Sequence, residues 1–584
     1  MGEQKNLFLA IILSIGIIVV FQIFFPQQTM IIQEDESIQK SETITSIDQA
    51  QEIETTKIKT RDEIVKDSEL GIKNSERISI ESSSLIGSIN LEGGIIDDLI
   101  LIKYKESLDE NSKNIQLLSP SGTKNPYYLE IGWKELSNNS NNIDLPDHKT
   151  KWSSSSNLLS PNNPVTLSWT NDQMITFNTH ISVDNDYMFL IRQEVINNSS
   201  EKIDIFPYRF IKRINKPDTI NFFILHEGLI SMTNDELLEK DYDDLMDDCS
   251  SANSIKSKSD YCNNKSIGGW LGFTDKYWLT TLIPGQSEEI NINYRHNKKD
   301  DTNDYRAGYA GNVITINPNN SINYSGKLFA GAKVVRILNK YKEEQNIVRF
   351  NDSVDWGWFS FLTKPIFYAI NWFYLKVGNF GLAIIGFTIL MRIFLFPLAQ
   401  ASFKSMAKMK KLQPEMQRLK ELHGNDKSKM QQELMGLYKK EGANPVAGCL
   451  PILLQIPIFF ALYKTLFVTI EMYHAPFYGW IHDLSAPDPA GILILFGLVK
   501  WNVPAILSIV NIGVLPIIMG LTMYIQQKLN PAPTDPVQAK IFTFLPIVFT
   551  FILAGFAAGL VLYWSVNNAL SILQQWIIQR KIVK

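Results

Sequence analysis

The sequence has few cysteines: three among 584 residues, too few for a scaffold held together by disulfides. Cys249 and Cys262 lie in a polar part of the chain, and Cys449 lies in an apolar part. If the polar part is extracytoplasmic, Cys249 and Cys262 can form a disulfide. The alternative is two free thiols in a loop rich in Asp and Ser, and that composition favours the free thiols.

The chain also lacks a strong charge of either sign. Its formal net charge is −4 and its pI is about 6.1, so the composition gives no reason to expect direct nucleic-acid binding. These averages hide a segmented chain. Residues 7–25 and most of 380–580 are apolar enough for a membrane, whereas 27–350 is polar.

The N-terminal apolar run, residues 7–25, has no cleavage site of small residues after it. Because it is longer than the apolar core of a cleaved signal peptide, we predict a signal-anchor transmembrane helix at 1–26. Residues 27–80 are rich in Ser, Glu, Lys, Gln and Thr. Such a segment cannot bury enough apolar surface to offset the entropy of ordering, so we predict a flexible linker.

Short alternating or β-branched segments recur between residues 81 and 345, for example at 164–169, 174–183 and 187–196. Clusters of Asn, Ser, Asp and Gly separate them. Strands at this density, with no helical pattern between them, predict a β-sandwich domain.

Sugar-processing enzymes also use such sandwiches, so the histidines of this region bear on function. His226 has a neighbouring acid, Glu227. Adjacent side chains on a strand point to opposite faces, which argues against an acid–base pair. A binding or spacing domain is therefore the favoured interpretation, and a membrane-tethered sugar enzyme is the weakest alternative for the whole chain.

Residues 355–377 are dense in aromatic side chains with interspersed lysines, a composition typical of an interfacial amphipathic helix. The next run, 381–398, is long and apolar enough to cross a bilayer but contains Arg392. A charge at the centre of a span costs about 2.5–3.5 kcal/mol on insertion scales, so such a residue usually faces water, a partner or a cavity. Helical spacing puts Thr388 and Arg392 on one face. The alternative is an arginine that snorkels to the headgroups.

The segment with Arg392 is one of several apolar segments in a predicted membrane domain at 378–584. The predicted transmembrane helices of this domain lie at about 379–400, 447–468, 506–527, 541–556 and 558–578. With the signal anchor, they make a polytopic α-helical protein with six transmembrane helices.

Residues 402–441 interrupt the apolar segments and carry more Lys and Arg than Asp and Glu. Apolar residues at helical spacing, with a break at 423–426, predict an antiparallel helical hairpin. Its stripe is rich in methionine: Met406, Met409, Met416 and Met430. Methionine suits apolar partners of variable shape, or it simply packs the two helices together; the two interpretations are compatible.

Positively charged loops stay in the cytoplasm. The hairpin and Arg580–Lys581 are therefore expected inside, and the loop 471–490, which has acids but no Lys or Arg, is expected outside with the β-domain. Counting spans places both termini in the cytoplasm.

In this orientation, polar residues from several spans share the cytoplasmic half of the membrane, namely Arg392, Gln455, Gln526 and polar residues between Asn567 and Gln575. Polar groups at one depth need water or one another. They predict a hydrated groove open to the cytoplasm. The outer halves are apolar, with Lys464 as the exception.

Six segments, in order along residues 355–580, resemble the YidC family of membrane protein insertases: 390–398, 405–414, 444–451, 455–459, 480–485 and 559–565. The anchor, linker and large β-domain resemble the Gram-negative branch. In that branch the periplasmic domain is a β-supersandwich similar to sugar mutarotases.

The resemblance implies insertion and chaperoned folding of membrane proteins in the bacterial inner membrane, without covalent chemistry, alone or with the Sec translocon. In the family, an arginine at the position of Arg392 attracts acidic residues of a substrate's N-terminal tail. Substrate spans slide along an apolar face that includes the positions of Thr388, Tyr563 and Trp564. The expected groove residues are Arg392, Thr388, Gln455, Tyr563, Trp564, Asn567 and Asn568.

The expected partners are nascent membrane proteins, the lipid bilayer, Sec components, the ribosome and the signal recognition particle receptor. The hairpin is the expected first contact with substrate. Ribosome docking through the short segment after Lys581 is not expected. The main alternative function is an ion- or solute-coupled transporter with Arg392 as an anion site, but the sequence shows neither a polar path across the membrane nor inverted repeats. We predict no catalytic residue, cofactor or metal site.

Overall fold

The computed structural model describes residues 59–69, 76–136, 143–220, 224–250, 259–299, 301–423, 426–442, 450–499, 503–504, 507, 510–530 and 536–583. All of them belong to one compact unit, residues 55–584. The predicted signal anchor at 1–26, most of the predicted linker and Cys449 lie outside the described residues.

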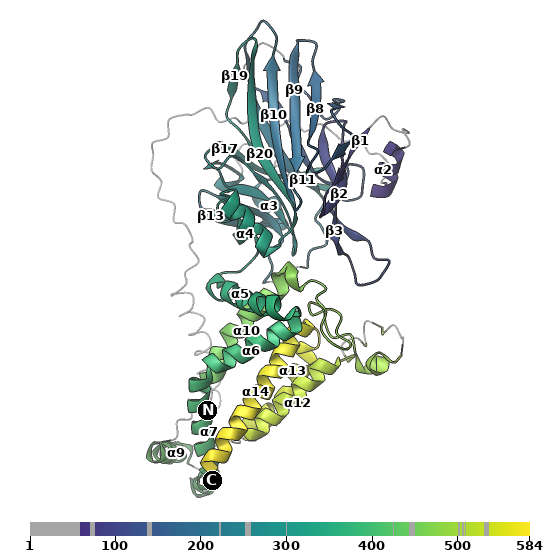
Figure 1. The fold of residues 1–584 in the computed structure, drawn as a ribbon. Helices are drawn as coiled ribbons and strands as arrows, with labels where there is room; N and C mark the ends of the chain where they lie inside the picture. Colours follow the sequence, from purple (N-terminus) through teal and green to yellow (C-terminus); the bar gives the residue numbers. More distant parts are fainter. Residues whose placement is uncertain are drawn as a thin grey trace, which may run out of the picture. The chain divides into compact units, whose positions relative to one another are not determined.

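The β-domain consists of two large sheets (Figure 1). The eleven-stranded sheet contains β1 (Arg77–Glu81), β2 (Leu85–Asn90), β3 (Ile95–Lys105), β4 (Asn114–Leu118), β5 (Tyr127–Glu135), β7 (Leu158–Leu159), β11 (Ile203–Ile214), β14 (Asn263–Ile267), β17 (Glu289–Lys299), β18 (Thr302–Ala310) and β19 (Ile314–Ile316). The nine-stranded sheet contains β6 (Ser153–Ser154), β8 (Val165–Thr170), β9 (Ile175–Val183), β10 (Met188–Asn197), β12 (Gly228–Thr233), β13 (Glu236–Asp241), β15 (Trp270–Thr274), β16 (Trp278–Ile283) and β20 (Asn320–Ala332).

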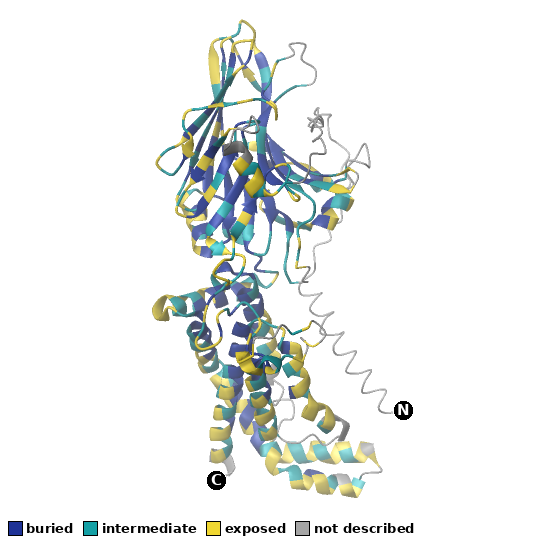
Figure 2. Cartoon of the chain, turned by 90° about the vertical axis from the view of Figure 1, so that its right-hand side faces the viewer, coloured by how far each residue is buried: buried dark blue, intermediate teal, exposed yellow. Residues whose placement is uncertain are grey.

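The strands predicted from sequence alternation are confirmed as β8, β9 and β10. In β9, buried side chains such as Ile175 and Phe177 alternate with more exposed ones such as Asn178 and His180. The buried side chains of both sheets form one hydrophobic core. Figure 2 colours the buried residues along the strands dark blue. The β-sandwich prediction is therefore confirmed, and the physical reason is the two-residue period of the apolar side chains.

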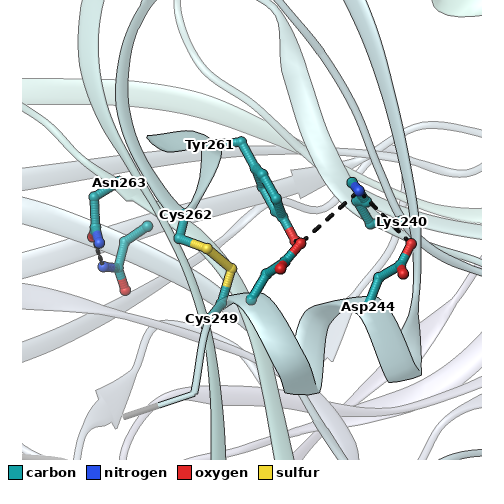
Figure 3. The surroundings of a disulfide bond; sticks show 8 residues. Lys240, Asp244, Cys249, Tyr261, Cys262 and Asn263 are labelled. Atoms are coloured by element: carbon teal, nitrogen blue, oxygen red, sulfur yellow. Dashed lines mark hydrogen bonds and ion pairs between the residues drawn. A yellow bond between two sulfur atoms is a disulfide. The ribbon is translucent and has the colours of Figure 1, made fainter. Parts of the chain in front are cut away.

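Cys249 and Cys262 form a disulfide, with their Cα atoms 5.6 Å apart (Figure 3). Cys249 follows α3 (Tyr242–Asp248), and Cys262 ends the short helix η1 (Asp260–Cys262). The preference for free thiols was wrong. It rested on the polar residues between the two cysteines, whereas the cysteines themselves are buried in the hydrophobic core.

Part of the predicted linker is ordered: residues 61–69 form helix α2 (Arg61–Glu69), and β1 begins at Arg77 rather than after residue 80. Thr60 and Glu63 form a capping box, because each backbone N–H donates to the side chain of the other, at 2.7 and 3.3 Å. Arg61 binds both carboxylate oxygens of Asp98 at 2.8 and 3.0 Å. The composition of the segment could not predict the contact between Arg61 and Asp98, because Asp98 belongs to β3.

The C-terminal region of the described chain is helical. Its helices are α4 (Val335–Glu344), η2 (Phe350–Ser353), α5 (Ser360–Val377), α6 (Phe380–Phe394), α7 (Phe396–Lys411), α8 (Gln413–His423), α9 (Lys427–Glu441), α10 (Leu450–Val468), η4 (Ile470–Met472), η5 (Ile492–Gly497), α12 (Val514–Leu529), α13 (Pro536–Leu553) and α14 (Ala558–Val583). Among the described residues, no single helix combines the length and apolar composition expected of a membrane span, whereas α6 and α7 do so as a pair bent by 67°.

The bend between α6 and α7 divides the predicted helix at 379–400. Pro397 at the start of α7 cannot continue a preceding helix, because it lacks an N–H and its ring clashes with the carbonyl four residues earlier. As a consequence, the helix that leads into the predicted hairpin begins at Phe396, not at residue 402. The helix predicted from residue 506 begins only at Val514.

Candidate functional site

Arg392, in the last turn of α6, is bound by polar groups of α14. Its Nε donates to Oδ1 of Asn567 at 2.9 Å, and Nη2 donates to the backbone carbonyl of Asn567 at 3.0 Å. Nη2 also donates to Oγ of Ser571, one helical turn further along. The spacing of four residues puts Asn567 and Ser571 on one face of α14, which packs against α6.

A second polar contact joins α10 to the same helix. Gln455 donates from Nε2 to the hydroxyl of Tyr563, one helical turn before Asn567. Trp564 is half-buried, and its ring lies 4.6 Å from that of Phe459 and 6.0 Å from that of Phe549, measured between centroids. The predicted groove residues Arg392, Gln455, Tyr563 and Asn567 thus meet where α6, α10 and α14 approach one another.

Asn568 lies on another side of α14 and does not join the Arg392 cluster. Its Nδ2 donates to Oγ1 of Thr522 on α12 at 3.4 Å. Further along, Gln575 donates to Oδ1 of Asn530 at 3.0 Å. Polar residues of α14 therefore serve two interfaces, and the sequence pattern did not distinguish them.

Thr388 and Tyr563 are almost inaccessible, with exposed fractions of 1% and 2%. The Thr388 hydroxyl donates to the carbonyl of Ile384 in its own helix at 2.7 Å. Of the three positions expected to contact a sliding substrate span, only Trp564 is partly accessible. Ser571 was not among the predicted site residues; its place four residues after Asn567 was the available signal.

Two of the four predicted methionines, Met406 and Met416, make packing contacts. Met406 is buried with Phe403 against Ile578 of α14. Met416 on α8 accepts a hydrogen bond from the hydroxyl of Tyr438 on α9, with 3.6 Å between sulfur and oxygen. The other two predicted methionines, Met409 and Met430, are half-buried. Met435 on α9, which was not predicted, is 59% exposed.

Helix α5 has two distinct faces. Thr363, Ile366, Phe367 and Ile370 are buried. The opposite side exposes large apolar side chains, namely Phe361, Tyr368, Trp372 and Leu375. Helix α5 is therefore not a fully buried core helix, and its exposed side, like its buried side, carries large apolar side chains.

In the β-domain, His226 and Glu227 do not face one another. The ring of His226 contacts the carbonyl of Leu229 at 2.8 Å, whereas Glu227 accepts from the backbone N–H of Ile220 at 2.7 Å. A different histidine and acid do lie close together on neighbouring strands, with 3.4 Å between Nε2 of His180 and Oε2 of Glu194. Because they are far apart in the sequence, the search for adjacent residues did not find them. Asn178 donates to the same carboxylate at 2.8 Å, and these bonds lower the pKa of Glu194. The pair belongs to a side-chain ladder across β8, β9 and β10.

Two family models match the chain: one described as 60Kd inner membrane protein over residues 372–584, and one described as YidC periplasmic domain over residues 77–369. A protein of Pelagibacter ubique named membrane protein insertase YidC is 44% identical over 586 residues, which covers 99% of both chains. A Rickettsia bellii protein of the same name is 44% identical and covers 98% of both. The chain belongs to the YidC family.

Among solved structures, an active YidC insertase with its first transmembrane domain resolved is 17% identical and covers 85% of this chain and 91% of that chain. The TM-score between the two structures is 0.35. Membership of the YidC family agrees with the sequence resemblance and does not favour the transporter. The YidC family consists of insertases rather than enzymes, which also disfavours a tethered sugar enzyme.

Proposed function

We propose that this chain inserts membrane proteins into the bacterial inner membrane, with Arg392 as the charged element of its substrate groove. One observation carries the role of Arg392. Among the described residues, its hydrogen-bond partners are neutral, and no carboxylate lies within ion-pair distance. The positive charge is therefore oriented by α14 but not neutralised there.

A half-buried positive charge of this kind attracts an acidic segment. At an effective dielectric constant of 20, two unit charges 4 Å apart attract by about 4 kcal/mol, against about 1 kcal/mol in water. An acidic residue in the tail of a substrate gains this energy only while the tail is near Arg392. Transfer of the adjoining apolar span into lipid, about 0.8 kcal/mol per buried CH₂, supplies the larger driving force.

The membrane arrangement belongs to the same proposal. The signal anchor and helices α6, α10, α12, α13 and α14 cross the inner membrane, with both termini in the cytoplasm. The β-domain is periplasmic, and the exposed face of α5 lies at the membrane surface. The groove opens to the cytoplasm, and α8 and α9 form the cytoplasmic hairpin that meets substrates first.

The proposed substrates are nascent membrane proteins, handled alone or beside the Sec translocon, with a chaperone role in folding. The ribosome and the signal recognition particle receptor are proposed as further partners. Family membership supports these proposals.

Arg392→Ala tests the role of the charge. In reconstituted vesicles, we expect insertion of a single-span substrate with an acidic tail to fall about tenfold, which corresponds to about 1.4 kcal/mol. Arg392→Lys keeps the charge and should stay within about threefold of the wild type, because a point charge still attracts a carboxylate. Protection of the translocated tail from protease measures insertion.

Two controls isolate the electrostatic effect. Arg580→Ala removes an arginine that stacks on Trp576 near the end of α14, and we expect no loss of insertion. A substrate whose tail acids are replaced by amides should insert equally with wild type and Arg392→Ala. Equal insertion of the acidic substrate by both proteins would contradict the proposed role of Arg392.

A further inference from the structure

Lys464 is the one charged residue that the sequence placed in an otherwise apolar outer half of a predicted span, and the Arg392 cluster does not include it. On α10 its side chain is only 4% exposed and pairs with the 9%-exposed side chain of Asp355, with 2.5 Å between Nζ and Oδ2. Its Nζ also donates to the backbone carbonyl of Ile224. Charged side chains are rarely buried unless they are paired. The burial of Lys464 is therefore accounted for by its ion pair with Asp355 and its hydrogen bond to Ile224.

Asp355 joins three parts of the chain at this point. It lies just before α5 and accepts the backbone N–H of His226 at 2.8 Å, in the segment that leads into β12. It also accepts the N–H of Gly357 at 3.2 Å. Through one carboxylate, α10 is thus connected both to the β-domain and to the beginning of α5.

The residues that follow α10 continue this attachment. Glu471 accepts the N–H of Val335, the first residue of α4, at 3.0 Å. Tyr473 donates to the carbonyl of Lys105 at 2.7 Å, and its ring lies 5.0 Å from that of Tyr277. Val468 and Ile470 are part of the hydrophobic core of the β-domain.

At the other end of α10, Gln455 contacts Tyr563 beside Arg392. Nine residues separate Gln455 from Lys464 (464 − 455 = 9), which places them on opposite sides of the helix and about 14 Å apart along its axis. One end of α10 therefore belongs to the proposed groove, and the other end is held by the β-domain.

We propose that the β-domain has a positioning function in this protein: it holds the outer end of α10 and thereby fixes Gln455 against Tyr563. The holding contacts are those of Lys464, Glu471 and Tyr473, which we call the α10 dock. The consequence for Gln455 rests on the proposed insertase function, whereas the dock itself does not.

Hydrogen exchange of the full-length protein in nanodiscs tests the dock. Lys464→Met leaves Asp355 buried without its cation, so we expect amides in 463–473 and 224–229 to exchange at least tenfold faster, and those of α14 to stay unchanged. The double variant Lys464→Met/Asp355→Asn removes both charges and should recover part of the protection. The matched control is Lys364→Met, which breaks the 2.6 Å pair with Asp352 on η2 but no contact of α10.

Unchanged exchange in 463–473 of Lys464→Met would overturn the proposal. If exchange in Lys464→Met rises equally in α14, the substitution has loosened the whole fold. In that case the double variant Lys464→Met/Asp355→Asn tests the dock. Faster exchange confined to the dock in the double variant supports the proposal, and wild-type exchange throughout overturns it.

Insertion in vesicles separates this proposal from the proposed function. We expect Lys464→Met to lower insertion several-fold for substrates with acidic and with neutral tails alike. The reason is that the substitution releases α10, so that Gln455 is no longer fixed against Tyr563 in the proposed groove. Arg392→Ala should act only on acidic tails. If tail charge has no influence in Arg392→Ala, the electrostatic role fails while the exchange result still stands. Wild-type insertion by a Lys464→Met protein with a loosened dock would overturn the positioning function.

Discussion

Glu471 carries a carboxyl group in apolar surroundings. Burial raises its pKa to about 7, while hydrogen bonds from backbone N–H groups, including that of Val335, oppose the rise. Its Oε2 is shielded from solvent and has no hydrogen-bond partner among the described residues. The Glu471 carboxyl group thus binds the first residue of α4, but burial destabilises its ionised form.

This raised pKa predicts a pH dependence of stability. Between about pH 4.5 and 7 the folded protein binds more protons at Glu471 than the unfolded chain does, so the free energy of unfolding falls as pH rises through this range and levels off above pH 7. Glu471→Gln keeps the acceptor for Val335 and should flatten this slope. Thermal unfolding of the full-length protein from pH 5 to 8 checks it.

Another acid, Asp97, contributes in the same direction, so the comparison must be between variants. Burial raises the pKa of Asp97, which is 2% exposed, to about 6. Its contribution is common to wild type and Glu471→Gln, and the difference between the two curves isolates Glu471. Parallel curves would show that Glu471 does not titrate in this range.

Single residues also show how far the sequence could predict the site. The cost of a charge in an apolar helix singled out Arg392, and the shared depth of polar residues brought α14 to it. Which polar residues of α14 bind Arg392 depends on how two helices cross, and the sequence does not specify this. Asn568 therefore belongs to a different interface from Asn567, and Ser571 was one of the polar residues between Asn567 and Gln575 but was not singled out as a site residue.

Helix α2 is an element whose start is marked by local sequence. The capping box of Thr60 and Glu63 satisfies two backbone N–H groups that would otherwise lack partners. Thr60→Ala removes one of these bonds and should cost about 1 kcal/mol, which corresponds to about fivefold faster exchange of amides in 61–69. Hydrogen exchange measures this directly. Glu63→Gln keeps both bonds and is the control; equal exchange in wild type and Thr60→Ala would contradict the cap.

Element boundaries were predictable where the period of apolar residues changes, and not where distant residues set them. Alternation located β8, β9 and β10 closely. The start of α12 was placed eight residues too early (514 − 506 = 8), because 506–513 is as apolar as the helix itself. What marks the real start is remote: Asp488 accepts the N–H of Leu515 at 2.7 Å. Pro397, by contrast, was a visible signal for the break after α6.

For the whole molecule, composition separated a β-domain from a helical region, but not the contacts between them. Lys464 could be recognised as unusual from its sequence, yet its partner Asp355 lies before α5 and had no visible connection to it. Such long-range pairs form because the fold brings them together. This is why the groove was predicted in outline and the α10 dock was not.

The burial of Thr388 and Tyr563 leads to a prediction about how a substrate meets the whole helical region. Thr388 is 1% exposed, whereas Trp564 is partly accessible. A photo-crosslinking residue at position 564 should therefore label a nascent membrane span several times more strongly than one at position 388. Ile389, which is 43% exposed on the same helix, is the control for contact with lipid rather than substrate. Equal labelling from 388 and 564 would contradict this prediction and would mean that Thr388 becomes accessible during insertion.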